Sequence, residues 1–142
     1  MTLHPALLKR GPDTWETPDA LFAQLDAQHH FTLDVCATPE TAKCPRYFTP
    51  EDDALKQSWA GEVCWMNPPY GHQIAHWIRK AYEEAQAGAT VVCLIPSRTD
   101  TAWWHNYVMR GSIYLVRGRL RFHGAAHNAP FPSAVVIFGG QP

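Results

Sequence analysis

Hydrophobic and polar positions alternate along this chain in blocks that predict strands and helices in turn. Continuous apolar runs at Val63–Met66 and Thr90–Ile95 are typical of buried strands, and the second is uniform enough for a central parallel strand. Between them, residues 73–87 carry the best helical spacing in the chain, with Gly88 at its end. The apolar positions of this predicted helix are Ile74, Trp77, Ile78, Ala81, Tyr82 and Ala85.

Further elements are predicted on either side of this block. Thr17, Pro18 and Asp19 have the residue types of an N-cap, a first helical position and a first-turn acid, so a helix is expected from there to about residue 28. The other expected elements are a buried strand at 31–36, a short strand at 46–48 within the irregular stretch 38–60, a crossover helix at 100–110, and strands at 112–116 and 133–138 joined by a loop from Arg117 to Pro132.

This alternation indicates a doubly wound α/β fold. We expect a mostly parallel, twisted sheet flanked by helices, in a single domain spanning residues 1–142 with 1–14 as a loose N-terminal arm. In such sheets, ligands bind beyond the carboxyl ends of the strands. Polar, turn-rich clusters follow predicted strands at Asp34, at Asn67–Tyr70 and at Pro96–Asp100. All three clusters should therefore lie on one edge of the sheet.

The most informative cluster is Asn67-Pro68-Pro69-Tyr70. The Asn67 side-chain oxygen and the Pro68 carbonyl can each accept one hydrogen of a planar amino group, and Tyr70 offers a ring for the flat group attached to it. Pro68 and Pro69 have fixed φ and restrict the residue before them, so the acceptors are held rigidly. Drawing both hydrogens toward acceptors favours a pyramidal nitrogen whose lone pair can attack a methyl group, by electrostatic preorganisation. The plainer alternative is an ordinary turn, since Asn and Pro are common turn formers.

Composition narrows the class of protein. A chain of 142 residues that is 46% hydrophobic can bury one core. It has no apolar stretch of about 18 residues and no signal-peptide pattern, so we expect a soluble, intracellular protein with no membrane partner. The cysteines form no Cys-x-x-Cys pair and are expected as reduced core thiols. A zinc site built from Cys36, Cys44 and nearby histidines is the less favoured alternative, so no metal is expected.

Charge is distributed unevenly along the chain. The net charge is −1, but residues 1–97 hold 7 Lys and Arg against 12 Asp and Glu, whereas residues 98–142 hold five arginines and a single acid, Asp100. Such asymmetry indicates a polyanion-facing edge on an acidic domain, with a solvated basic face as the alternative. The five arginines are Arg98, Arg110, Arg117, Arg119 and Arg121.

Together, these segments resemble the phage-type DNA N6-adenine methyltransferases. The matching segments follow the family's order from about residue 15 to 138, nearly the whole chain. They are Trp15–Pro18 with Leu21 and Phe22, Leu33–Ala37, Tyr47–Thr49 with Asp52–Leu55 and Trp59, Asn67–Gly71, Leu94–Thr101, Arg117–Phe122 and Pro130–Ala134. The resemblance implies a Rossmann-like domain that uses S-adenosylmethionine and methylates N6 of adenine in double-stranded DNA. It also implies a cytoplasmic enzyme of a bacterial cell, encoded by a phage or prophage.

The resemblance implies roles for individual residues as well. Asp34 corresponds to a carboxylate near the methionine moiety of the cofactor, and Asp53 to the acid that contacts its adenine amino group. A strand-end turn former and an acidic N-cap, respectively, are the alternatives for these two residues. Where many methyltransferases have a glycine-rich turn after the first strand, this chain has Ala37–Glu40. The other cofactor positions implied are Thr17 and Pro18, in a segment closing over the methionine end, and Cys36, Ala37 and Asn67.

Chemistry at N6 requires access to the base. We expect the adenine to leave the duplex, because N6 cannot reach a buried sulfonium while the base is stacked. Tyr70 would then stack on the base while Asn67 and the Pro68 carbonyl hold N6 in line, with Pro69 stiffening the turn. The DNA contacts, mainly to phosphates, are expected from Arg98, Arg117, Arg119, Arg121 and His123.

Other methyl acceptors stay open at this point. RNA adenine and the side-chain amide of a protein glutamine present the same planar amino group, and a non-catalytic DNA-binding relic would keep the fold. Because the first predicted strand begins at residue 31, little room precedes it for the helical substrate domain of protein-glutamine enzymes. The intact Asn67–Tyr70 motif argues against a relic. Neither the recognition sequence nor the oligomeric state follows from any pattern in the chain.

Overall fold

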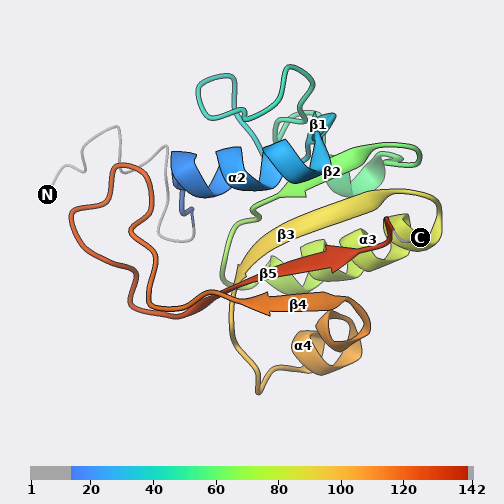
Figure 1. Cartoon of the computed structure of the whole chain (residues 1–142). Helices are drawn as coiled ribbons and strands as arrows, with labels where there is room; N and C mark the ends of the chain where they lie inside the picture. The colour runs from blue at the N-terminus through green and yellow to red at the C-terminus, as the bar shows by residue number, and fades with distance from the viewer. Residues whose placement is uncertain (1–13, 141–142) are drawn as a thin grey trace, which may run out of the picture.

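The computed structural model describes residues 14–140, in which five strands form one sheet in the order β1-β2-β3-β5-β4 (Figure 1). The strands are β1 (Leu33–Asp34), β2 (Val63–Met66), β3 (Thr90–Pro96), β4 (Ser112–Leu115) and β5 (Ser133–Phe138). The helices are α2 (Asp19–His29), α3 (Ile74–Gln86) and α4 (Ala102–Asn106), with 3-10 turns η1 (Ala54–Lys56) and η2 (Val108–Arg110).

The sheet is mixed. Strands β1, β2 and β3 pair in parallel, whereas β5 pairs antiparallel with both β3 and β4. Four strands therefore share one direction, and only β5 is reversed. The chain passes from β4 to β5 through the loop 117–132, which contains no helix, and a parallel pair would need a longer crossover connection. The predicted α/β fold with flanking helices is confirmed.

Helices cover both faces of the sheet, with α2 on one face and α3 and α4 on the other (Figure 1). The predicted stripe of α3 is buried at Ile74, Ile78 and Ala81, because these positions recur at helical spacing against β3 and β5. Helix α2 packs less deeply, and Phe22 meets the Trp65 ring edge-on at 5.4 Å.

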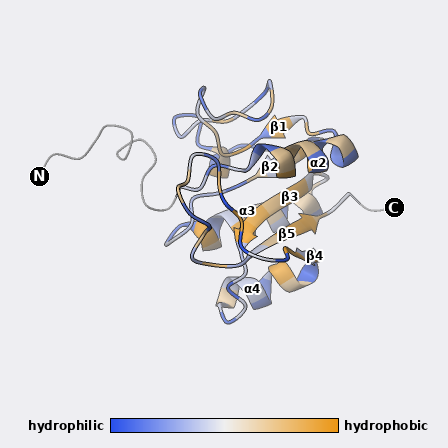
Figure 2. Cartoon of the chain, turned by 60° about the vertical axis from the view of Figure 1, so that its left-hand side comes forward, coloured by the Kyte–Doolittle hydropathy of each residue, from blue (hydrophilic) through white to orange (hydrophobic). Residues whose placement is uncertain are grey.

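The core lies along β3, whose residues from Val91 to Pro96 are all buried. The central strands form the most hydrophobic band of the ribbon, as Figure 2 shows. This confirms the prediction of a central strand, although β3 is parallel to only one of its two neighbours. All four cysteines are free thiols, and burial raises the pKa of the Cys93 thiol above its ordinary range.

Four predicted elements differ from the structure. Thr17 is not the N-cap of α2: Pro18 occupies that position, with φ −60° and ψ 133°, and no side chain caps the helix. The strand at 31–36 is reduced to β1, and the one at 46–48 to a bridge between Asp34 and Tyr47. The helix at 100–110 splits into α4 and η2 at Tyr107, whose φ of −126° is not helical.

One edge of the sheet collects the segments that matter for function. Strands β1 to β4 all end there, and the loop 117–132 leaves β4 and enters β5 on the same edge. Figure 1 shows this loop beside the start of α2. The three polar clusters predicted after the strands therefore share an edge with the basic loop. Within residues 14–140, no helix is both long enough and apolar enough to cross a membrane.

Candidate active site

The Asn67–Tyr70 turn follows β2 directly at this edge. Met66, Pro68 and Tyr70 are buried, whereas Asn67 and Pro69 are partly exposed. The backbone of the turn is thus anchored in the core, and the Asn67 side chain is left at the boundary between core and solvent.

The Asn67 side chain is fixed at both ends of its amide. Its Nδ2 donates to the main-chain carbonyl of Trp15 and to the Thr17 hydroxyl, the latter at 3.0 Å. Its Oδ1 accepts from the Tyr70 hydroxyl at 2.9 Å. A carbonyl oxygen accepts only, so the contact with Trp15 fixes which end of the amide carries the nitrogen.

Tyr70 is buried, with 2% of its surface exposed. Its hydroxyl lies within bonding distance of the Leu94 carbonyl at 3.1 Å as well as of Asn67, and burial raises its pKa well above the ordinary value. Its ring packs edge-on against Phe131 at 5.6 Å and Phe122 at 6.5 Å. In this conformation the ring is therefore not open to a nucleobase, and the stacking expected from the sequence requires its neighbours to move.

An aromatic cluster formed by Trp15, Tyr70, Phe122 and Phe131 lies beside Asn67. The Trp15 ring is 5.4 Å from that of Phe122 and 5.2 Å from that of Phe131. These rings come from the N-terminal segment, the turn after β2 and the loop 117–132, which are far apart in the sequence. In the sequence, Trp15 was noted only as part of the segment Trp15–Pro18, and no pattern gave a sign of these partners.

Asp34 is 2% exposed and holds the turn after β1. Its Oδ1 accepts from the Cys36 N–H at 3.1 Å and its Oδ2 from the Lys43 N–H at 3.0 Å. Burial raises the pKa of Asp34 to about 6, although both hydrogen bonds pull it down. Asp34 is thus a turn former, and it also presents a buried carboxyl group to the cavity beside it.

A small cavity of about 60 Å³ opens between these residues. Ligand sites usually measure about 300–1,000 Å³, so this one is too small for a nucleoside-sized molecule. One wall is the N-terminal segment 14–17, which would have to move aside to admit such a ligand. The lining residues are Thr14, Trp15, Glu16, Thr17, Asp34, Cys36, Thr41, Lys43, Trp65 and Asn67.

The structure brings together only part of the predicted cofactor set. Thr17, Asp34, Cys36 and Asn67 line the cavity, whereas Pro18, Ala37 and Asp53 do not. Asp53 lies at the start of η1 in the left-handed region, at φ 54°, and its carboxylate is 3.7 Å from Lys56. Its side chain does not cap η1.

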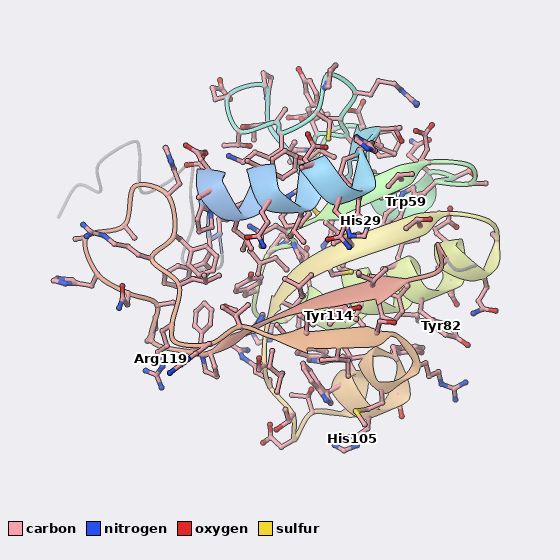
Figure 3. The ribbon with its side chains drawn as sticks, viewed as in Figure 1. His29, Trp59, Tyr82, His105, Tyr114 and Arg119 are labelled. Atoms are coloured by element: carbon pink, nitrogen blue, oxygen red, sulfur yellow. The ribbon has the colours of Figure 1, made fainter. Side chains whose placement is uncertain are left out.

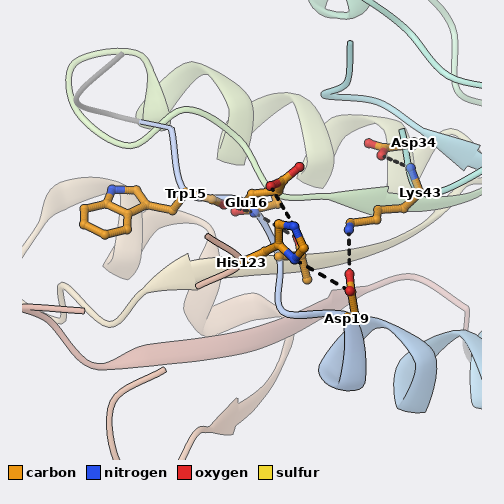
Figure 4. A network of polar contacts seen from close by, with 8 residues as sticks. Trp15, Glu16, Asp19, Asp34, Lys43 and His123 are labelled. Atoms are coloured by element: carbon orange, nitrogen blue, oxygen red, sulfur yellow. Dashed lines mark hydrogen bonds and ion pairs between the residues drawn. The ribbon is translucent and has the colours of Figure 1, made fainter. Parts of the chain in front are cut away.

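A polar network joins the N-terminal segment to its surroundings (Figure 4). The His123 ring lies 3.8 Å from the Glu16 carboxylate and 3.6 Å from that of Asp19, and Asp19 pairs in turn with Lys43 at 3.2 Å. The main-chain N–H of His123 also donates to the Glu16 carbonyl at 2.9 Å. His123, predicted as a DNA contact, thus also ties the loop 117–132 to the wall of the cavity. Glu16 and Lys43 were not singled out from the sequence, where solvated charges are common, and Asp19 was noted only as a first-turn acid.

The predicted DNA-contacting arginines are exposed on the same edge. Arg117, Arg119 and Arg121 alternate with the inward-facing Leu120 and Phe122, as expected for an amphipathic segment. Figure 3 shows Arg119 at the outer side of the loop. Within residues 14–140, no carboxylate forms an ion pair with these three arginines or with Arg98, which is also exposed.

The fold is an α/β fold consistent with that of a methyltransferase, and comparison with known proteins identifies the family. Residues 5–136 match the family DNA N-6-adenine-methyltransferase (Dam), so the chain belongs to that family. The DNA N-6-adenine-methyltransferase of Haemophilus phage HP1 is 30% identical over 118 residues, which cover 80% of this chain and 68% of the phage protein. The enzyme of the same description from Escherichia phage T1 is 30% identical over 94 residues, covering 65% of this chain and 39% of that protein.

The protein is a DNA adenine-N6 methyltransferase. This assigns DNA rather than RNA or protein glutamine as the substrate, and an enzyme rather than a relic. For the zinc alternative, residues 14–140 contain no group of three metal-ligating side chains that could hold an ion, around Cys36 and Cys44 or elsewhere.

Proposed function

We propose that this enzyme takes its methyl group from S-adenosylmethionine and transfers it to an adenine extruded from double-stranded DNA, at Asn67–Tyr70. The observation that supports this most directly is the position of Asn67. Its side chain lines the small cavity that contains Asp34, and it is bonded to Tyr70 of the aromatic cluster. Asn67 thus stands between a cavity that offers a carboxyl group to a charged donor and a cluster of rings suited to a flat base.

The residues around the cavity fit S-adenosylmethionine in their chemistry. The buried Asp34 carboxyl group offers a partner for a ligand ammonium group, and Thr17 and Asn67 line the same space. When bound, S-adenosylmethionine supplies an electrophilic methyl group carried on a sulfonium. The N-terminal segment must open for the ligand to fit, and only a ligand that extends beyond the cavity could contact Asp53.

In the proposed mechanism the protein positions one nitrogen. Asn67 Oδ1 and the Pro68 carbonyl accept the two hydrogens of the adenine amino group, which makes the nitrogen more pyramidal and more nucleophilic. Holding the amino group in near-attack geometry supplies much of the acceleration. Closing the segment over the site keeps water out. No general base is needed beforehand, because the proton leaves for solvent after the nitrogen has become cationic.

DNA would approach along the basic edge. Arg98, Arg117, Arg119 and Arg121 have no competing acid among residues 14–140 and can neutralise phosphates. Phe122 lies on the inner side of the same loop. The outward-facing arginines can therefore follow the sugar-phosphate backbone of the DNA while the inward-facing side chains contact the extruded base. The single-domain organisation is part of the same proposal; of the predicted loose arm 1–14, all but Thr14 lies outside the described residues.

Identifying the product tests this proposal. The protein is incubated with methyl-labelled S-adenosylmethionine and unmethylated duplex DNA, with the same DNA as single strands, and with RNA. Digestion should yield label in N6-methyladenine, with most of it from the duplex. No label in N6-methyladenine, or label that enters only single strands, would contradict the proposal.

A further inference from the structure

Asn67 is held by a segment about fifty residues earlier in the chain. Both acceptors of its Nδ2, the Trp15 carbonyl and the Thr17 hydroxyl, come from the short stretch before α2. Thr17 is only 2% exposed, so its hydroxyl needs a partner inside the protein. It does not cap α2, and it accepts a hydrogen bond from Asn67. The hydroxyl of Thr17 is therefore placed for Asn67 rather than for the helix.

This arrangement distinguishes an amide from a carboxylate at position 67. An asparagine donates through Nδ2 and accepts through Oδ1, whereas an ionised aspartate only accepts. An aspartate here would place a negative oxygen against the Trp15 carbonyl, with no hydrogen between them. A reversed amide would bring Oδ1 against the same carbonyl. The Trp15 carbonyl thus selects both the residue type and its orientation.

The other end of the amide is free to change partner. The Tyr70 hydroxyl has one hydrogen and two acceptors, Asn67 Oδ1 at 2.9 Å and the Leu94 carbonyl at 3.1 Å. When an adenine amino group arrives, the Tyr70 hydrogen can turn to Leu94. Oδ1 is then released to the substrate, and no buried group is left without a partner.

We propose that Trp15 and Thr17 are positioning residues for methyl transfer: their two acceptors hold the Asn67 amide so that its Oδ1 faces the adenine amino group. This inference rests on the proposed function and adds to it. It gives the N-terminal segment a role in orienting the catalytic side chain, beyond closing over the cofactor. It also explains why position 67 is an asparagine, because its Nδ2 donates to the Trp15 carbonyl, which lies outside the motif.

The test compares single-turnover transfer rates with cofactor affinity, using saturating S-adenosylmethionine and unmethylated plasmid DNA. Thr17→Val removes one acceptor at nearly constant volume and should lower the transfer rate about tenfold, as expected for one lost orienting hydrogen bond, while the S-adenosylmethionine Kd changes less than about threefold. Thr17→Ser should restore most of the rate. If Thr17 instead acts through cofactor contact, Thr17→Val will raise Kd and leave the saturated rate intact, which overturns the proposal.

Thr32→Val is the matched control. Its hydroxyl also accepts a hydrogen bond, from the Val63 N–H at 2.9 Å, but at the opposite edge of the sheet. The Thr32 hydroxyl is exposed and also donates to Glu62 at 2.7 Å, so this variant should lose hydrogen bonds far from the site and keep the wild-type transfer rate. If Thr32→Val slows transfer as much as Thr17→Val, the effect is a general loss of stability, and the positioning role is wrong.

Asn67→Asp provides an independent signature. At neutral pH its carboxylate repels the Trp15 carbonyl, so we expect a large loss of rate. A protonated acid can again donate to Trp15 and accept from the substrate, so the activity relative to wild type should rise as pH falls from about 8 to about 6. Full activity of Asn67→Asp at neutral pH overturns the inference. Full activity of Asn67→Ala would overturn the proposed function itself, so the two failures are distinguishable.

Discussion

His123 in the loop 117–132 and Glu16 in the N-terminal segment are joined twice, by a main-chain hydrogen bond of 2.9 Å and by a side-chain contact of 3.8 Å. The loop predicted to meet DNA and the wall of the proposed cofactor cavity are thus one connected surface. Opening the cavity must therefore move the loop, and DNA that binds the loop must affect the position of the cavity wall.

The first prediction concerns this connection. His123→Ala removes the side-chain contacts to Glu16 and Asp19 and leaves the main-chain bond in place. These contacts are half-exposed, so the loss of stability should stay below about 1 kcal/mol. Amide hydrogen exchange in residues 14–17 should nevertheless become faster. Unchanged exchange in that segment would show that the side chain does not hold the wall.

The second prediction concerns DNA binding. Arg119→Ala should weaken binding to duplex DNA of any sequence and reduce the slope of log affinity against log salt by about 1. Arg79→Ala is the control, because Arg79 is also exposed but lies on α3 and pairs with Glu83 at 3.1 Å. Equal salt slopes for both variants and wild type would show that the loop is not part of the DNA-binding surface.

The third prediction follows from the pKa of Asp34. Burial raises it from 3.8 to about 6, so the folded chain binds this proton more tightly than the unfolded chain does. Its contribution to the free energy of unfolding is therefore greatest below about pH 4 and falls, by up to about 3 kcal/mol, as pH rises through about 6. The unfolding free energy of wild type minus that of Asp34→Asn should therefore fall as pH rises over this range. A difference that does not vary with pH would contradict the shift.

The same group should govern cofactor affinity. An ammonium group prefers the ionised carboxylate, so S-adenosylmethionine should bind wild type more tightly as pH rises through about 6. Asp34→Asn should bind weakly at all pH values between about 5 and 8. Titration calorimetry measures both dependences, and parallel curves for the two proteins would exclude Asp34 from the cofactor site.

The fourth prediction separates the ring of Tyr70 from its hydroxyl. Tyr70→Phe removes the bond to Asn67 Oδ1 but keeps the packing against Phe131, so it should cost about 1 kcal/mol of stability and retain methylation within a few fold. Tyr70→Ala empties a buried site and should cost about 3–5 kcal/mol. Denaturant unfolding gives both values. A Tyr70→Ala variant as stable as wild type would contradict the burial of the ring.

Strong local patterns predicted the fold well. The range Val63–Met66 coincides with β2, and the helix expected at 73–87 is observed as Ile74–Gln86, because an apolar run and a helical stripe each specify one structure. The helix at 100–110 is interrupted at Tyr107, whose backbone is not helical, and no pattern in the sequence marks that position. The reversed β5 was missed, although the absence of a helix in the loop 117–132 favours an antiparallel neighbour.

The site was only partly predictable for a different reason. The residue types of the Asn67–Tyr70 motif were enough to indicate its chemistry. Its partner in the N-terminal segment is the main-chain carbonyl of Trp15, a group that every residue carries, so no sequence pattern could reveal it. Thr17 was assigned to the helix cap because local spacing favours that role, but the long-range bond to Asn67 took its hydroxyl instead.

The most direct test of the account is the single-turnover methylation rate of Asn67→Ala, measured beside its affinity for S-adenosylmethionine. The variant loses the acceptor for the adenine amino group, whereas Asp34 keeps its hydrogen bonds to Cys36 and Lys43. We expect the rate to fall about 100-fold or more, with cofactor affinity within a few fold of wild type. A variant that methylates DNA at close to the wild-type rate would contradict the assignment of this turn as the catalytic site.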